Sequence, residues 1–390
     1  MNTALRQLYE RARFVGAQSP RTVGVEDELL LVNQQTGEMG NALGVVARLV
    51  RMGWAPSYDD IHTHLLIGAT HPVLGTVTTD AGRGTLEWIS NPSSSMLNVA
   101  AWRGDTLDLM VVLAREMGEV ILGVGRQPLT RGGKELWVPK GRYEYLIARF
   151  GNQIHHIPET ASQQVHIGCR GTEDMVELVD DFLALSGVLT ALAANASVFH
   201  GAAHPDALAS RQRIWEEFAP ERVGVPAQPF HTLNRLIAWM CESEYLFRKE
   251  EVGGITRYAL DGQPFGTSES VSLANGEFGK HARYHEACLW QDARARHVFG
   301  TVEVRPCCQQ PQSAGLALPA LCLGLAENTS DRRALLGRHP WDAWRASRNS
   351  AADHGMHGMV GLIPIHAILP DVLAIAEAGL RSRGLGEEAL

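Results

Sequence analysis

The chain has 390 residues, 45% of them hydrophobic, and is therefore long enough to bury a large core. Its formal charge of −8 and its isoelectric point near 6.1 argue against a nucleic-acid-binding protein, which normally presents a basic face. The charged N-terminal segment lacks the apolar core of a signal peptide. No linker-like concentration of Pro, Gly or Ser and no internal repeat divides the chain, so we expect one continuous domain over residues 1–390.

Two further features of the sequence indicate whether the chain spans a membrane and whether its compartment is reducing. The most apolar stretch, residues 182–199, is interrupted by Ser, Gly, Thr and Asn, which predicts a buried helix and not a membrane span. Six cysteines occur without a Cys-x-x-Cys pair and without the density of a secreted disulfide scaffold, which favours a reducing cytoplasm. Adjacent side chains in a strand point to opposite faces, so we expect one of Cys307 and Cys308 to be buried and the other to lie at the edge of a site, with a redox switch as the alternative.

Turn residues separate strands and helices in the first part of the chain. The predicted elements there are a helix over 3–15, a strand over 23–32, a turn at 34–37, a helix over 42–52 that stops at Gly53, strands near 64–67 and 84–90 that flank a turn over 78–84, a helix over 98–117 and a strand over 120–124.

The rest of the chain is more helical, and strands and helices do not alternate regularly, which favours an α+β class over a doubly wound sheet. The predicted elements are a helix over 141–150, a polar loop over 151–163, a strand over 164–168, helices near 174–198 and 228–241, an active-site flap or irregular strands over 249–285, a strand over 300–305 and a mostly helical C-terminal third. We expect His155 and His156 to be exposed loop residues, because neighbours in sequence rarely bind one metal ion together.

Four strand-like segments each carry a carboxylate, a histidine or an arginine on an otherwise apolar strand. Because strand side chains alternate between two faces, Glu26 and Glu28 share one face. By the same count Glu303 lies beside Arg305, while the valines that flank Glu303 turn to the core. The four segments are Val23–Val32, Thr85–Ser90, Gln164–Gly168 and Thr301–Arg305.

One sheet could therefore carry several acids on a single concave face. Clustered oxygen ligands suit Mg²⁺, which binds a few carboxylates, keeps some of its waters and bridges to nucleotide phosphates. Each pattern also has a simpler interpretation. Glu26 and Glu28 could lie on the solvated face of an edge strand, and Glu303 and Arg305 could pair with each other. His166 could be a core histidine whose hydrogen bonds are satisfied.

At these residues the chain resembles the glutamate–cysteine ligase family, in particular its bacterial carboxylate–amine ligase branch. Gly24, Glu26 and Glu28 match the family's Gly-x-Glu-x-Glu strand, and residues 300–305 match its Gly-Thr-Val-Glu-Val-Arg strand. In the family's His-Val-His strand, Gln164 replaces the first histidine. Similar segments at residues 86–92, 194–201, 210–215, 218–226 and 344–348 complete an ordered set over about residues 20–355.

The resemblance implies a glutamine synthetase-like catalytic domain, with a curved antiparallel sheet that forms a funnel and helices packed outside it. It also implies an ATP- and Mg²⁺-dependent carboxylate–amine ligase that works through an acyl phosphate. Two or three Mg²⁺ ions would bind, with Mn²⁺ able to substitute. Glutamate, through its γ-carboxyl, and cysteine are the favoured substrates, which indicates glutathione biosynthesis.

The resemblance assigns roles to the motif residues. Arg305 would clamp the γ-phosphate or the acceptor carboxylate, and His166 would be a further catalytic or ligand group. The expected metal ligands are Glu26, Glu28, Glu87 and Glu303. Weaker candidates are Arg211 and Arg222 for the nucleotide, and Gln164, Arg142 and Tyr143 for the substrate.

The expected partners are small amino acid and amine substrates, with neither nucleic acid nor membrane, and a homo-oligomer is left open. A ligase of the same type for a different amino acid or amine is one alternative, because Gln164 departs from the family pattern. A non-catalytic nucleotide-binding protein that kept the fold is another, although the four retained glutamates argue against it.

Overall fold

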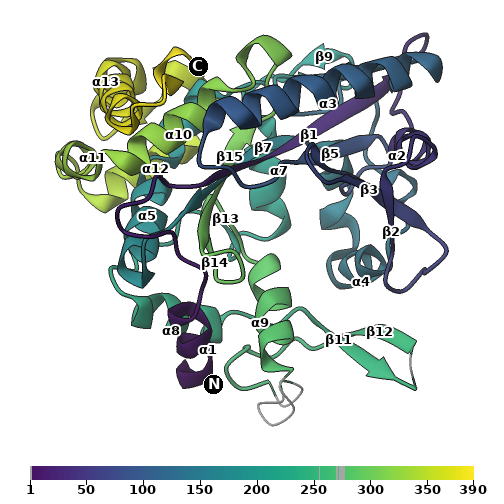
Figure 1. The fold of residues 1–390 in the computed structure, drawn as a ribbon, viewed down its shortest axis with the longest axis horizontal. Helices are drawn as coiled ribbons and strands as arrows, with labels where there is room; N and C mark the ends of the chain where they lie inside the picture. The colour runs from purple at the N-terminus through teal and green to yellow at the C-terminus, as the bar shows by residue number, and fades with distance from the viewer. Residues whose placement is uncertain (1, 254, 269–270, 272–276) are drawn as a thin grey trace.

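The computed structural model describes residues 2–253, 255–268, 271 and 277–390 (Figure 1). Nine strands of this described part form one antiparallel sheet in the order β14-β15-β7-β1-β5-β4-β3-β2, with β6 paired to β1. Its strands are β1 (Val23–Asn33), β2 (Ala55–Tyr58), β3 (Leu66–His71), β4 (Gly75–Thr79), β5 (Thr85–Ile89), β6 (Glu119–Leu122), β7 (Ser162–Gly168), β14 (Ala293–Arg296) and β15 (Thr301–Cys308).

Shorter strand pairs lie outside this sheet, and helices surround it. The pairs are β8 (Val198–Phe199) with β9 (Ala202–Ala203), β10 (Val223–Gly224) with β13 (Trp290–Gln291), β11 (Phe247–Val252) with β12 (Ile255–Leu260), and β16 (Met359–Val360) with β17 (Ile363–Pro364). The α-helices are α1 (Asn2–Glu10), α2 (Ala42–Arg51), α3 (Met96–Glu116), α4 (Gly141–Phe150), α5 (Thr172–Ala184), α6 (Ser186–Leu192), α7 (Ser210–Phe218), α8 (Leu233–Glu242), α9 (Phe278–Ala287), α10 (Ala317–Glu327), α11 (Thr329–Leu336), α12 (Trp341–His354) and α13 (Ile365–Arg383).

One face of the main sheet is apolar. The odd-numbered residues of β1 and β7, such as Val25, Leu29 and Val165, are buried in the largest core cluster. Helices α3 and α10 cover this face, above the sheet in Figure 1. Asp27 also points to this side, where it accepts a hydrogen bond of 2.5 Å from Arg103 of α3. The core face is thus apolar apart from a paired, buried charge and Gln163, which donates a hydrogen bond of 2.7 Å to Asp27.

A second, smaller apolar cluster lies on the other side of the molecule. It joins α4, α7 and the β11–β12 pair through Tyr143, Phe150, Phe218, Phe247 and Tyr258. In Figure 1, α4, α9 and the β11–β12 hairpin lie below the sheet. The polar face of the main sheet is therefore the face turned away from the large core.

Most predicted elements are confirmed, but several boundaries are wrong. The helix predicted over 174–198 is two helices that meet at Leu185, and the second ends at Leu192. The helix predicted over 3–15 ends at Glu10, β2 was not predicted, and β4 occupies part of the turn predicted over 78–84.

The strand predicted over 300–305 continues to Cys308. The register between β15 and β7 shifts between Val304 and Cys307, so Pro306, which has no N–H to donate, lies within the irregularity. The strand begins just after Gly300, whose φ of +65° and closeness to the Arg13 carbonyl leave no room for a side chain.

The expectation for the cysteine pair is wrong in part. Cys307 and Cys308 do point to different apolar clusters, but both are 1% exposed, so neither lies at the edge of a site.

The segment predicted as a flap over 249–285 contains the β11–β12 hairpin, apart from the first two residues of β11, and most of α9. Residues 254, 269–270 and 272–276 of that prediction lie outside the described residues. Among the helices that the structure describes, none combines the length and the apolar character needed to cross a membrane.

Candidate active site

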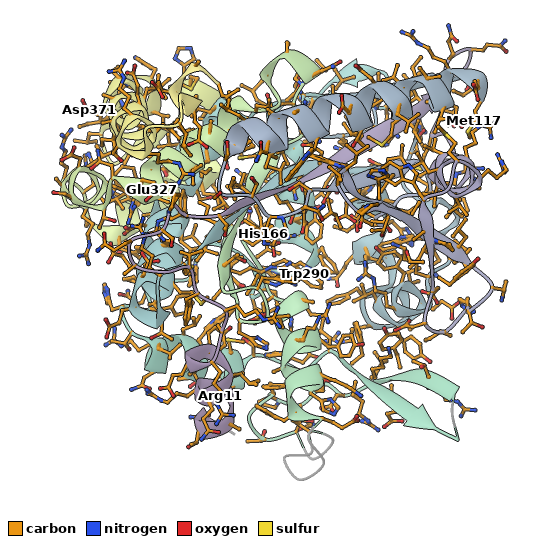
Figure 2. All side chains as sticks on the ribbon, in the orientation of Figure 1. Arg11, Met117, His166, Trp290, Glu327 and Asp371 are labelled. Atoms are coloured by element: carbon orange, nitrogen blue, oxygen red, sulfur yellow. The ribbon has the colours of Figure 1, made fainter. Side chains whose placement is uncertain are left out.

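The polar face of the main sheet collects the predicted residues from strands far apart in the chain. Glu26 and Glu28 of β1 point to this face, as the period-two pattern predicts. His166 lies on the same face of β7, near the middle of the molecule in Figure 2. The strand register places Glu28 opposite Glu87, Glu26 opposite Gln164, His166 opposite Glu303, and Glu303 opposite Arg294.

Glu303 is enclosed by three guanidinium groups. Its carboxylate is fully buried and accepts bonds of 2.8 and 3.0 Å from Arg294, a bond of 2.6 Å from Arg296 and a shorter one from Arg305. Burial alone would raise the pKa of Glu303, but the positive charges, that of Arg294 first, hold the pKa well below its usual value. We call Arg294, Arg296, Glu303 and Arg305 the arginine end of the face.

Carboxylates crowd together on β1, β5 and the turn after β4. Burial, reinforced by the charge of Asp80, raises the pKa of Glu28 to about 7. Burial and the charges of Glu26, Asp80 and Glu28 raise the pKa of Glu87 well above its usual value. We call Glu28, Asp80 and Glu87 the acid end of the face.

His166 lies between the two ends. Its Nε2 is 2.9 Å from Oε1 of Glu26 and 3.8 Å from Oε2 of Glu303, and its Nδ1 is 3.3 Å from the Thr301 hydroxyl. Potential ligand atoms of Glu26, His166 and Glu303 all lie within 4.8 Å of one another. His166 is therefore not a core histidine but part of the polar cluster.

Gln164 connects the two ends. Its Nε2 donates to Oε1 of Glu28 at 2.7 Å, and its Oε1 accepts a short hydrogen bond from Arg305. Glu28 also accepts from the backbone N–H of Ser162 at 2.6 Å. The side chain that replaces the family histidine is thus held by both of its polar atoms.

The predicted pair Arg142 and Tyr143 lies beside the acid end. Arg142 donates to the Tyr143 hydroxyl at 2.9 Å, and that hydroxyl donates to Oδ1 of Asp80 at 3.0 Å. Lys140, which starts the same segment, is buried and contacts the carbonyl oxygen of Thr79. Burial, together with the charge of Arg142, lowers the pKa of Lys140 to about 8.

The two arginines proposed for the nucleotide have different surroundings. Arg211 is buried, lies 3.4 Å from the carbonyl oxygen of Arg305, and lowers the pKa of Glu28 by its charge, so it adjoins the cluster. Arg222 is also buried, but it donates to the main-chain carbonyls of Cys288 and Glu244. These contacts are structural, and the structure does not bring Arg222 to the acids.

Four residues of the face were missed by sequence reasoning: Asp80, Lys140, Arg294 and Arg296. The two arginines had a usable signal, because Ala293-Arg-Ala-Arg296 alternates with period two just before the turn that leads into β15. Asp80 directly follows β4 and could have been linked to Glu87 by the short turn between β4 and β5. Lys140 had no such signal, since it comes from a segment outside the sheet.

The donor set at the acid end fits a hard divalent cation. Carboxylate oxygens are the ligands that Mg²⁺ prefers, and burial, followed by repulsion from neighbouring carboxylates, raises the pKa values of Glu28 and Glu87. A bound cation would relieve that repulsion. At the arginine end the oxygens of Glu303 already accept from guanidinium groups, so Glu303 is the least available of the four predicted ligands.

Comparison with known proteins matches residues 22–358 to glutamate–cysteine ligase family 2. A putative glutamate–cysteine ligase 2-1 of Streptomyces avermitilis is 25% identical over 352 residues, which are 84% of this chain and 77% of that protein. The chloroplastic glutamate–cysteine ligase of Arabidopsis thaliana is 28% identical over 317 residues, which are 78% of this chain. The chain spans only 60% of the length of that plant enzyme.

Solved structures extend the similarity to the fold. The glutamate–cysteine ligase of Francisella tularensis, solved in complex with AMP, aligns with a TM-score of 0.54 at 10% identity, over 97% of this chain and 82% of that one. A bifunctional glutathione synthetase from Pasteurella multocida aligns with a TM-score of 0.50 at 12% identity, over 99% of this chain and 46% of that one. At these identities the likeness concerns the fold alone, and it agrees with the expected α+β class, an antiparallel sheet with helices packed outside it.

Proposed function

Because the chain belongs to glutamate–cysteine ligase family 2 and is thus an ATP-dependent amide ligase, we propose that it joins the γ-carboxyl of glutamate to the amine of cysteine. Relatives that carry this activity in their names support the choice of substrates. Such a product would serve glutathione biosynthesis.

Amide formation in water is uphill, so the carboxylate must first become a better electrophile. Transfer of the γ-phosphoryl group of ATP gives an acyl phosphate, and the amine then displaces phosphate from it. The protein must hold the two reactants in line and stabilise the charge that spreads over the transferring group.

The arginine end is suited to the phosphoryl group. Arg305 presents a rigid, planar donor set that matches phosphate or carboxylate oxygens. Arg294 and Arg296 add two fixed positive charges beside it, all ordered by Glu303. In this arrangement Glu303 positions the guanidinium groups, in addition to the ligand role that the family resemblance implies.

The acid end is suited to metal ions. Glu26, Glu28 and Glu87 would hold two or three Mg²⁺ ions together with Glu303, and Mn²⁺ would substitute. When bound, these ions neutralise part of the triphosphate charge. His166 would orient Glu26 or serve as a further ligand, since its Nε2 is already 2.9 Å from that carboxylate.

The substrate amino acid would lie near Arg142 and Tyr143. Asp80 accepts from Tyr143, and Tyr143 accepts from Arg142, so the guanidinium has a fixed position from which it can meet a substrate carboxylate.

One observation carries the proposal: a single sheet face holds an acid end for cations next to an arginine end for anions. Neighbouring sites of opposite sign are what a metal–triphosphate and an acidic substrate require. The same geometry argues against a binding protein without catalysis, because the arginines and acids that phosphoryl transfer needs are all present.

The test is ADP release with Mg²⁺, glutamate and a panel of amines, and in parallel with other acids. Glutamate and cysteine together should give the highest rate, and chelation of divalent ions should abolish it. With hydroxylamine in place of the amine, the acyl phosphate should be trapped as a hydroxamate. Binding of Mg-ATP without ADP release or hydroxamate from any acid would overturn the proposal.

A related ligase with a different acid or amine is the second candidate. Gln164 favours it, because this side chain replaces the family histidine and is fixed between Glu28 and Arg305. A glutamate-dependent hydroxamate combined with a preference for an amine other than cysteine would select this candidate.

The last two proposals concern the compartment of the protein and its oligomeric state. We propose a cytoplasmic protein, although the plant relatives are named as chloroplastic. A homo-oligomer would appear as a higher mass in light scattering.

A further inference from the structure

A second group of metal-binding side chains lies outside the active site described above. His156, Glu159 and His200 bring Nδ1, a carboxylate oxygen and Nε2 within 4.8 Å of one another. His156 and Glu159 belong to the turns just before β7, whereas His200 lies in the β8–β9 hairpin. The prediction that His155 and His156 are exposed loop residues is confirmed only in part: both lie in a turn, but they are half-buried, and Nδ1 of His156 contacts Glu159 although 44% of its side chain is exposed.

The distances suit one small cation. Oε1 of Glu159 is 3.0 Å from Nδ1 of His156 and 3.9 Å from Nε2 of His200. In a tetrahedral site with metal–ligand bonds of about 2.0–2.1 Å, ligand atoms are roughly 3.3 Å apart. Shortening the Glu159–His200 distance from 3.9 Å to this value, with the two ring nitrogens brought to a similar separation from within 4.8 Å, would place all three atoms in coordination.

The carboxylate is already oriented for this purpose. Glu159 is fully buried, and its other oxygen, Oε2, accepts bonds of 2.9 and 3.0 Å from Arg126. A hydrogen-bonded second oxygen is the usual support of a carboxylate that binds metal, and it leaves Oε1 facing the two histidines. Arg126 also adds a positive charge, which would moderate the affinity.

His200 is held in place but lacks a hydrogen-bond partner at its inner nitrogen. Its ring packs on Phe199 with centroids 3.6 Å apart, and the Phe199 ring in turn contacts the guanidinium of Arg126 at 3.9 Å. The buried Nε2 makes no hydrogen bond, and the backbone of His200 has a φ of +48°, which is uncommon outside glycine. A ring nitrogen without a hydrogen-bond partner and an uncommon backbone conformation both indicate that this ring could bind a ligand.

The glycine at position 132 leaves space beside the ligand atoms of the cluster. A side-chain carbon at Gly132 would lie 2.6 Å from Nδ1 of His156 and 2.9 Å from Oε1 of Glu159. Glycine at this position keeps both ligand atoms accessible.

We propose that His156, Glu159 and His200 form a binding site for a transition-metal ion of the Zn²⁺ class, distinct from the Mg²⁺ site of the sheet face. Two imidazoles and one carboxylate, with a fourth position open to water, are a common zinc donor set, whereas hard Mg²⁺ prefers oxygen ligands. A bound ion would tie the β8–β9 hairpin to the start of β7, the strand that carries Gln164 and His166.

The test uses the full-length protein, freed of metal and then titrated with Zn²⁺ in excess Mg²⁺ by calorimetry, with Co²⁺ as a spectroscopic probe. Wild type should bind one ion with intense visible bands of four-coordinate Co²⁺. His156→Gln and His200→Gln should each weaken that binding by at least about 100-fold, more than loss of a supporting group does. Gly132→Ala, which keeps all three ligands, should also weaken it.

Two control variants separate this site from other histidines. His204→Gln changes another histidine near the same hairpin, and His166→Gln changes the sheet-face cluster, so both should retain the ion and its spectrum. Unchanged Zn²⁺ affinity in both His156→Gln and His200→Gln would overturn the proposal, as would loss of the ion in His166→Gln alone. Circular dichroism and thermal unfolding of the metal-free variants would show that each one is folded.

Discussion

The arginine end and the acid end of one sheet face balance their charges differently. At Glu303 three guanidinium groups surround a single carboxylate, and its pKa falls well below the usual value. At Glu28 and Glu87, carboxylates face one another across β1 and β5, and both pKa values rise. Three glutamates that look equivalent in their motifs, Glu28, Glu87 and Glu303, are thus in two electrostatic classes.

The difference teaches that a strand motif specifies which face a side chain occupies but not its charge state. Glu303 completes a buried ionic network and contributes to stability by itself. Glu28 and Glu87 lack such compensation, and a metal ion would supply it. The following predictions test this division, in order of expected effect.

Replacing Glu303 should have the largest effect on stability. Glu303→Gln leaves three buried guanidinium groups without their shared anion, and losing one partner of a buried ion pair costs about 3–5 kcal/mol. The free energy of unfolding, measured by urea titration in the presence of chelator, should fall by that amount.

Glu28→Gln is the matched control, the same chemical change at the acid end. It should leave the stability of the metal-free protein at pH 8 unchanged or higher. Equal losses in the two variants would erase the distinction between the ends.

Arg305→Lys should reduce catalysis while it keeps the charge. Lysine cannot reproduce a two-pronged contact with an oxyanion, and loss of such a contact in the transition state costs about 2–4 kcal/mol, or roughly 30- to 1000-fold in kcat/KM. Steady-state ADP release measures the effect, with Arg381→Lys on the exposed part of α13 as the control. A kcat/KM within about twofold of wild type would place Arg305 outside the reaction.

The stability of the metal-free protein should depend on pH through Glu28. Its pKa is raised from 4.5 to about 7, so the folded state holds a proton that the unfolded state releases. The resulting stabilisation is complete below the unfolded pKa and is lost as the pH rises through about 7, a change of roughly 2–3 kcal/mol between pH 5 and 8.

Thermal unfolding in chelator across this pH range measures the effect. Glu28→Gln should make the profile less steep without flattening it, because the pKa of Glu87 is raised as well, and saturating Mg²⁺ with nucleotide should also make it less steep by stabilising the ionised carboxylates. A wild-type profile identical to that of Glu28→Gln would contradict the raised pKa.

Gln164→Met should have the smallest effect on stability, because it removes the hydrogen bonds that join the two ends without changing a charge. Methionine keeps the length of the buried side chain but loses the bonds to Glu28 and Arg305, which should cost about 1–2 kcal/mol. Chemical unfolding measures the cost. A variant as stable as wild type would show that the two ends are independent.

Much of the site could be predicted from local sequence because its signal is local. Glu26 and Glu28 lie on one face by the two-residue period alone, and the same rule applies to Glu303 and Arg305. The alternation of Arg294 and Arg296, followed by a short turn, contained equal information and was overlooked. Helix boundaries such as the break at Leu185 were less accessible, since an apolar stretch that begins at Phe182 runs across the break into α6.

The sequence by itself therefore determined the four strands that carry the motif residues, the face that these residues share and the family. Only the tertiary structure decided how the charges on that face pair, because the strand order β15-β7-β1 joins segments more than a hundred residues apart. Gln164 contacts Glu28 and Arg305 across 136 and 141 residues of sequence, and Lys140 reaches the face from outside the sheet. A carboxylate's pKa depends on burial and on every charge within a few ångströms, quantities that exist only once the chain has folded.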